Sequence, residues 1–141
     1  MRLRVGLLIV PLLLGLQAAA RAQEHDLERE AERARQAWFS HDAGALVSGS
    51  PRLVVRLPGA DPSVALGQAQ AAALLRDYLA STQEVETTIR SAREVEPGRG
   101  YVELHRRYRV AGTQDVRSQT LLLGYRMDPE GWTLVELRVG G

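Results

Sequence analysis

The stretch from residue 100 to residue 139 constrains the fold more than any other part of this chain. It holds three long runs rich in β-branched, aromatic and apolar residues, separated by the short segments AGTQ (111–114) and DPEG (128–131). These two segments carry the Gly, Pro and Asp residues that tight turns prefer. The stretch therefore predicts an antiparallel meander of three strands, against which the earlier segments must pack.

The side chains of the first two strands also predict their register. Pairing Val110 with Asp115 around the AGTQ turn gives one face that is apolar at one end and polar at the other. The pairs that follow are Leu104 with Leu121, Val102 with Leu123, Tyr108 with Arg117, and Arg106 with Gln119.

The third strand changes phase along its length. Trp132 and Leu134 fall on one side, whereas Leu137 and Val139 fall on the other. Either both faces of this strand are covered, or a bulge near Val135 shifts the phase. We favour the bulge, because strongly bent sheets need one.

The N-terminus has the pattern of a cleavable secretory signal. Arg2 and Arg4 precede a short apolar run that is interrupted by Pro11, and an A-x-A site ends at Ala22. Residues 1–22 are therefore a predicted signal peptide, and residues 23–141 form one domain of a secreted or periplasmic protein. An uncleaved anchor is disfavoured, because the apolar run is shorter than the roughly 20 residues that span a bilayer. We expect no membrane contact after cleavage.

Composition excludes several classes of function. Without Arg2, Arg4 and Arg21 the chain has 15 basic against 17 acidic residues, so it lacks the basic balance of a nucleic-acid-binding domain. The absence of cysteine excludes disulfides, thiolate metal sites and a cysteine nucleophile. The three histidines show no metal-ligand spacing, so we expect neither a metal nor a cofactor.

The first half of the chain predicts helices interrupted by one short strand. Residues 24–39 place Leu27, Ala31, Ala34 and Trp38 on one helical stripe, and Asp42 can cap a short helix over 43–47. A strand over 52–57, a helix over 66–80 and an alternating strand over 84–91 follow. The last of these places Val85, Thr87 and Ile89 on its inner side.

This order of elements resembles the nuclear transport factor 2-like superfamily, which includes ketosteroid isomerase-like and SnoaL-like proteins. The features that carry the resemblance are Trp38-Phe39 followed by His41-Asp42-Ala43, the helix over 66–80, Gly100-Tyr101-Val102, and Gly131-Trp132 with Leu134, Leu137 and Val139. The resemblance implies an α+β fold, in which a curved antiparallel sheet wraps around N-terminal helices as a cystatin-like cone. Within the superfamily, the chain is most similar to small secreted bacterial members of unassigned function.

Two groups of residues are candidates for the site. The resemblance implies a pocket carboxylate that acts as a base, and Asp42 is the nearest candidate, although a helix cap explains it equally well. The polar end of the sheet brings together a second group, which can meet a small apolar or anionic ligand. This group consists of Arg106, Tyr108, Arg117 and Gln119, with Tyr78 from the helix over 66–80. Alternatively, Arg106 and Arg117 only cover the rim of the sheet with their stems.

These observations lead to three hypotheses for the function. The first is a noncatalytic domain that binds a ligand or a partner. The second is an isomerase, dehydratase or cyclase that uses Asp42 or another pocket carboxylate as its base. The third is a structural module that forms a homodimer through the outer face of the sheet, where His105 lies in a polar row.

Overall fold

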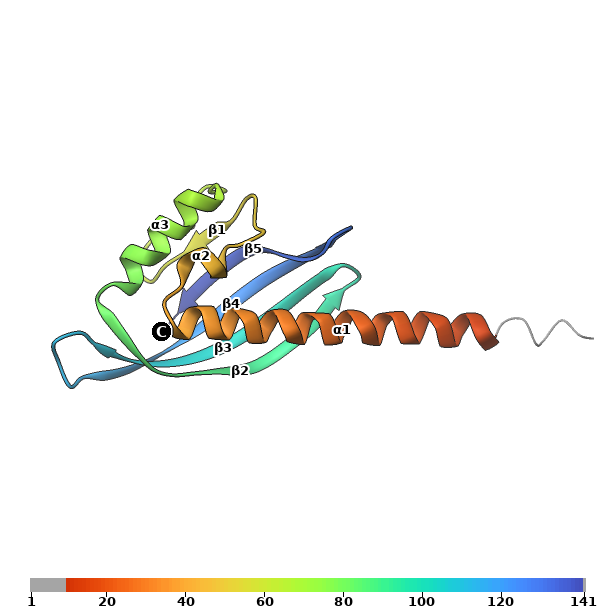
Figure 1. Cartoon of the computed structure of the whole chain (residues 1–141), viewed down its shortest axis with the longest axis horizontal. Helices are drawn as coiled ribbons and strands as arrows, with labels where there is room; N and C mark the ends of the chain where they lie inside the picture. Colours follow the sequence, from red (N-terminus) through yellow and green to blue (C-terminus); the bar gives the residue numbers. More distant parts are fainter. Residues whose placement is uncertain (1–9, 141) are drawn as a thin grey trace, which may run out of the picture.

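The computed structural model describes residues 10–140, which form three helices and one five-stranded sheet (Figure 1). Residues 1–9, which hold the basic start of the predicted signal, lie outside the described part. The elements are α1 (Val10–Phe39), α2 (Ala43–Leu46), β1 (Val54–Arg56), α3 (Gln68–Leu79), β2 (Thr82–Glu96), β3 (Arg99–Val110), β4 (Val116–Asp128) and β5 (Gly131–Gly140).

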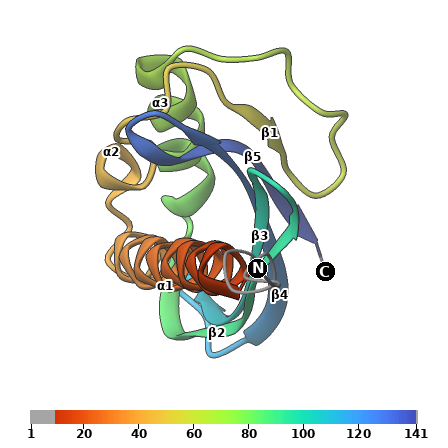
Figure 2. The same ribbon diagram turned by 90° about the vertical axis from the view of Figure 1, so that its right-hand side faces the viewer.

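The sheet has the strand order β1-β5-β4-β3-β2, with β1 parallel to β5 and every other pair antiparallel. It curves around the helices, which all lie on its concave side (Figure 2). Helix α1 packs mainly on β2, and α2 lies between α1 and α3. The predicted α+β cone is therefore confirmed.

The predicted register of β3 and β4 is confirmed at every predicted pair, from Val102 with Leu123 to Tyr108 with Arg117. The predicted bulge is also present. Gly124 pairs with Glu136 and the next residue of β4 pairs with Leu134, so Val135 is the extra residue of β5. The bulge shifts the alternation of side chains by one residue. As a result, Trp132 and Leu134 before it and Leu137 and Val139 after it all face the core.

Strand β2 differs from its prediction in length and in phase. It runs over 15 residues, and its pairing with β3 shifts at three places, the first between Glu84 and Glu86. This shift leaves Val85 unpaired and 37% exposed, while the Glu84 side chain is 1% exposed. Thr87 and Ile89 pair with the buried residues Arg106 and Leu104, as members of the predicted row should. The prediction is wrong for Val85, because the bulge places Glu84 inside in its stead.

Helix α1 extends in the N-terminal direction beyond its predicted start at residue 24. Its first turns reach past the end of the sheet (Figure 1), and the helix is continuous through Ala22. Cleavage after Ala22 stays a prediction. Among residues 10–140, no helix combines the length and the apolar character that crossing a membrane requires.

The apolar stripe of α1 fills the concave side of the sheet. Leu27, Ala31, Ala34 and Trp38 are all at most 6% exposed, as the spacing predicts. The approach to β3 is close, because a Cβ at Gly100 would lie 2.7 Å from Cδ2 of Leu27. A larger residue at this position would have to displace the Leu27 side chain where the helix meets this strand.

Trp132 ties the end of the meander to the same helix. Its indole is 8% exposed, and Nε1 donates a hydrogen bond of 3.0 Å to the carbonyl oxygen of Gln23. Trp132 is therefore a core anchor whose buried N–H bonds to a carbonyl oxygen.

Candidate functional site

A group of polar side chains lies inside the cone, at the end of the sheet nearest the C-terminus of α1. We call it the interior polar cluster; it consists of His41, Tyr78, Glu84, Arg106 and Gln119. Arg106 lies at its centre and is fully buried. Its guanidinium donates to Glu84, to Oε1 of Gln119 at 3.2 Å and to Oγ1 of Thr82 at 3.1 Å. A buried cation needs such partners, because desolvation would otherwise cost several kcal/mol, on the order of the penalty for an unpaired ion.

Aromatic rings surround the same guanidinium. Its Cζ lies 4.1 Å from the centroid of the Tyr108 ring and 5.1 Å from that of Trp38. Both distances are within the range of a cation–π contact, which is strongest where water is excluded. The interior polar cluster is therefore enclosed by rings and held together by its own hydrogen bonds.

Tyr78 and Gln119 close the cluster on the side of α3. The Tyr78 hydroxyl donates to Oε1 of Gln119 at 3.0 Å, the same oxygen that accepts from Arg106. Burial raises the pKa of Tyr78, and its hydrogen bond to Gln119 opposes that effect. The phenol therefore stays protonated and acts as a donor within the cone.

His41 joins the cluster through an unusual backbone position. Its N–H donates to the carbonyl of Trp38 and that of Asp42 donates to the carbonyl of Ala37, which is the hydrogen-bond pattern of a Schellman C-cap. His41 has a φ of 56°, where glycine is preferred. This conformation directs the imidazole to β2, where Nε2 lies 3.2 Å from Oε1 of Glu84.

Four of the five residues predicted to form a ligand site are brought together here: Tyr78, Arg106, Tyr108 and Gln119. The fifth, Arg117, is not part of the group. Its side chain is 61% exposed and pairs with Asp115 at 2.9 Å, beyond the end of the polar face. The two residues that the sequence did not suggest as site residues are Glu84, hidden by the bulge in β2, and His41, at the end of α1.

Asp42 lies outside the cluster. Its carboxylate accepts a hydrogen bond of 3.0 Å from the N–H of Ala45, and the side chain is exposed at the start of α2. This is the geometry of a helix cap, the second of the two interpretations that the sequence allows.

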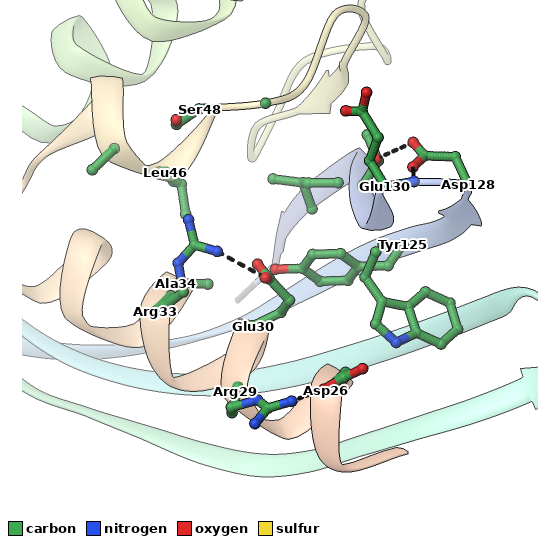
Figure 3. Close-up of a pocket in the computed structure, with 16 residues that line it drawn as sticks. Asp26, Arg29, Glu30, Arg33, Ala34, Leu46, Ser48, Tyr125, Asp128 and Glu130 are labelled. Atoms are coloured by element: carbon green, nitrogen blue, oxygen red, sulfur yellow. Dashed lines mark hydrogen bonds and ion pairs between the residues drawn. The ribbon is translucent and has the colours of Figure 1, made fainter. Parts of the chain in front are cut away.

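A separate cleft of about 420 Å³ lies between α1, α2 and the β4–β5 turn (Figure 3). We refer to it as the cleft. Its apolar wall comes from Ala34 of α1, Leu46 of α2 and Leu134 of β5, and the aromatic residues Tyr125 and Trp132 line it as well. Its volume is within the range of sites that enclose small molecules. No member of the interior polar cluster is among its lining residues.

Tyr125 presents the most distinctive polar group of the cleft. The residue is 5% exposed, and its hydroxyl points toward Glu30 (Figure 3). Burial raises the pKa of Tyr125, the charge of Glu30 raises it further, and Arg33 has the opposite effect. The hydroxyl is therefore uncharged over the whole physiological range.

The charged residues around the cleft fall into two sets. On α1, Arg29 pairs with Asp26, and Arg33 pairs with Glu30 at 2.8 Å. At the β4–β5 turn, the Asp128 carboxylate accepts from the Thr133 hydroxyl and from the N–H of Glu130. The hydrogen bond from Thr133 is the main cause of the lowered pKa of Asp128. Both arginines of the cleft are therefore paired, and the turn contributes negative charge.

A second hollow of about 640 Å³ lies between the loop after β1 and the outer part of β4 and β5. Its lining includes Leu122 and Arg138 but no aromatic residue among those described. It lacks the aromatic side chains that line the cleft, although its lining is less polar than that of the cleft.

Solved structures that are similar to this chain share its fold. A ketosteroid isomerase-like protein from Erwinia carotovora has 15% identity and a TM-score of 0.68, over 83% of this chain and 94% of that protein. A nuclear transport factor 2-like protein with a cystatin-like fold from Novosphingobium aromaticivorans has 20% identity and a TM-score of 0.66, over 89% and 86%.

A third structure contains a small molecule. It is a hypothetical protein with a ketosteroid isomerase-like fold from Catenulispora acidiphila in complex with trimethylamine, with 13% identity and a TM-score of 0.63, over 79% of this chain and 84% of that one. No family model and no curated protein matches the chain.

The cone and these similarities define an α+β protein of the cystatin-like type. More narrowly, the fold is that of the nuclear transport factor 2-like superfamily, so the predicted resemblance is confirmed at the level of the fold. At these identities the comparisons carry no residue role over to this chain.

Proposed function

We propose that this protein is a noncatalytic binding domain, secreted or periplasmic, that holds a small molecule in the cleft. The observation that carries the proposal is the cleft itself: about 420 Å³, with apolar and aromatic side chains on part of its wall and charged and polar residues on the rest. The fold is compatible with this role, since the protein from Catenulispora acidiphila was solved with a small molecule bound. The predicted signal at residues 1–22 supports the location.

The chemistry of the cleft favours binding over catalysis. Its acids on α1 are paired with arginines, and Asp128 holds the turn through Thr133. No histidine occurs among the described lining residues, so the cleft has no imidazole to serve as a general base.

The proposal is tested by a thermal-shift screen of small molecules of different charge on three proteins. Ser48 is exposed and lines the cleft, so a Ser48→Trp variant should fill the opening and abolish the shifts. Ser118→Trp is the matched control, because Ser118 is exposed on β4 away from the cleft. Compounds that stabilise the wild type and Ser118→Trp but not Ser48→Trp support the proposal. A screen without any stabilising compound contradicts it.

One observation favours the enzymatic alternative. His41 Nε2 and Glu84 Oε1 are 3.2 Å apart, and a carboxylate beside an imidazole is a combination that can move protons. Against it, Arg106 already pairs with Glu84 inside the cone. The alternative predicts that a bound ketone exchanges its α protons in D2O, measured by NMR, and that Glu84→Gln abolishes the exchange.

Homodimerisation through the outer face of the sheet stays a prediction. Sedimentation equilibrium at high protein concentration tests it. A molar mass equal to that of one chain would contradict it.

A further inference from the structure

The outer face of the sheet carries two arginines side by side. Arg99 begins β3 and lies directly opposite Arg126 of β4, so the two side chains leave the same face of the sheet. They lie near the end of the sheet that the β2–β3 and β4–β5 turns share (Figure 1). Like charges that face each other across a ladder destabilise it. An anion bound between the two guanidinium groups would remove that cost.

The neighbouring acids do not supply this anion. Glu96 of β2 lies opposite Arg99, but no ion pair joins these two described residues. The charge of Arg126 favours the ionised form of Asp128, whose carboxylate accepts from the Thr133 hydroxyl instead. Seven other arginines of the described chain each pair with a carboxylate. The opposed pair on β3 and β4 therefore differs from most arginines of this protein.

Both arginines line a hollow of about 300 Å³ between β3, β4 and β5. We call it the arginine hollow; its charged and aromatic lining includes Arg99, Tyr101, Arg126 and Glu136. Glu136 is the one acid among the described lining residues, and it pairs with Arg138. After this pairing the arginine hollow keeps two positive charges.

A glycine keeps the space between the flanking side chains free. Gly124 of β4 lies opposite Tyr101 on one side and opposite Glu136 on the other. A Cβ at this position would lie 3.3 Å from Cε1 of Tyr101 and 3.3 Å from Cβ of Glu136. The volume of the hollow is at the lower end of the range for small-molecule sites. It therefore has room for a small organic body beside a charged group.

A smaller hollow next to it has the same charge. It has a volume of about 190 Å³ and shares Arg126 and Val135 with the arginine hollow. Its other cation is Arg52, whose Nη1 donates a hydrogen bond of 3.2 Å to the carbonyl oxygen of Ala65. No acid occurs among its described lining residues. Positive charge therefore continues past Arg126 toward the segment before β1.

We propose that the arginine hollow is a second binding site, separate from the cleft, for a small organic phosphate ester. A guanidinium can donate to two phosphate oxygens at once. A phosphate monoester carries about −1.5 to −2 charges at neutral pH, which matches the two positive charges of Arg99 and Arg126. A carboxylate carries one negative charge and would leave half of this charge unmatched. The organic body of the ester lies against the Tyr101 ring.

Three aromatic probes of different charge test the ligand class. Phenyl phosphate is mostly a dianion at about pH 7.5, benzoate is a monoanion and benzyl alcohol is neutral. In NMR titrations of the full chain, phenyl phosphate should shift the amide signals of residues 99–101, 124–126 and 133–136. Its affinity should exceed that of benzoate by roughly fivefold or more, because the second charge is matched as well. Benzyl alcohol should leave these signals in place.

Variants with one charge fewer test the residues. Arg99→Gln and Arg126→Gln should each weaken phenyl phosphate binding by about threefold to tenfold. Arg76→Gln is the matched control, because Arg76 is exposed on α3 and lines none of the four hollows described. Ser48→Trp, which fills the cleft, should also leave phenyl phosphate binding unchanged. This last variant separates the arginine hollow from the cleft.

A measurement without ligand tests the repulsion between the two arginines. In low salt, Arg126→Gln should raise the melting temperature by about 1 to 4 °C, because the opposed charges are removed. Arg76→Gln should not raise it. Phenyl phosphate should then stabilise the wild type more than Arg126→Gln. A lower melting temperature for Arg126→Gln would mean that the protein itself satisfies this arginine, and it would overturn the proposal.

The binding experiments can overturn the proposal in three ways. Benzoate that binds as tightly as phenyl phosphate would refute the phosphate class. Equal weakening in Arg76→Gln and Arg126→Gln would show a general attraction to positive charge and no site. Phenyl phosphate that shifts none of the named amide signals would show that the arginine hollow stays empty. Each of these results leaves the proposal for the cleft intact, because the two sites share neither arginine.

Discussion

The interior polar cluster and the cleft contain similar residue types but differ in how these residues are satisfied. In the cluster, Arg106 is fully buried; its terminal nitrogens bond to Glu84, Thr82 and Gln119, whereas its Nε has no partner among the described residues. In the cleft, the charged side chains lie at an open surface: Arg29 and Arg33 pair with acids of α1, and the described residues include no ion-pair partner for Asp128 or Glu130. The comparison teaches that a group of polar residues on a concave sheet is not by itself a ligand site. What matters is whether the protein already supplies the partners.

The difference has an energetic meaning. A buried ion pair contributes little net stability when it is complete, but removal of one partner leaves an uncompensated charge. Polar groups at an open cleft have access to water, so their substitution changes stability little. We therefore expect variants of the cluster to affect folding and variants of the cleft to affect binding.

The largest effect is expected from Arg106→Met, which leaves the Glu84 carboxylate buried without a cation. The loss should be about 3 to 5 kcal/mol of unfolding free energy, measured by urea denaturation at pH 7. The double variant Arg106→Met with Glu84→Met should recover most of it, because no unpaired charge remains. A single variant that loses less than about 1 kcal/mol would contradict the description of the cluster.

Asp42→Ala should have an intermediate effect. Loss of its hydrogen bond to the Ala45 N–H removes the cap of α2, which typically costs about 1 kcal/mol. Ligand binding in the cleft should stay the same, because Asp42 belongs to neither region. Thermal denaturation and the thermal-shift screen measure both properties. Preserved stability combined with lost binding would instead indicate a functional role for Asp42.

Much of this comparison was not accessible from the sequence. The register of β3 and β4 and the bulge at Val135 were predictable, because the turns and the two-residue side-chain period determine them locally. The same period misplaced Val85 and Glu84 on β2, since the bulge at Val85 has no turn residue to mark it. The partner of Arg106 was missed for this reason.

The cleft was not predictable for a different reason. It forms where three segments meet that are far apart in the chain: the middle of α1, the residues around α2, and the turn between β4 and β5. No short motif encodes such a meeting. The sequence gave no sign that Tyr125 would lie beside Glu30.

Tyr125→Phe should change stability little at neutral pH and more at alkaline pH. The pKa of Tyr125 is raised above its ordinary value of 10.0, so its stabilising contribution is complete below pH 10.0 and is lost as the pH rises toward the folded-state value. Above pH 10.0 the unfolded chain ionises at this residue before the folded one. The wild type should therefore lose stability more steeply than Tyr125→Phe, measured by urea denaturation between pH 9 and pH 11, roughly the range in which phenols ionise. Parallel curves for the two proteins would contradict the buried position of the phenol.

The smallest effect is expected for Asp128→Asn in acid. The pKa of Asp128 lies below its ordinary value of 3.8, so its contribution is present above pH 3.8 and is lost as the pH falls through the folded-state value. The wild type should lose stability more steeply than the Asn variant in this range. Thermal melts below pH 4, about where aspartates protonate, measure the difference. A steeper loss in the variant would mean that Thr133 does not stabilise the ionised carboxylate.

The most direct test of a binding cleft is a two-dimensional NMR titration of the full chain with the compound that raises its melting temperature most. The account predicts that the shifted amide signals cluster in residues 26–34, 45–49 and 125–134, the segments that line the cleft. Shifts confined to Glu84, Arg106 and Gln119, or to the loop after β1, would place the ligand elsewhere and contradict the account.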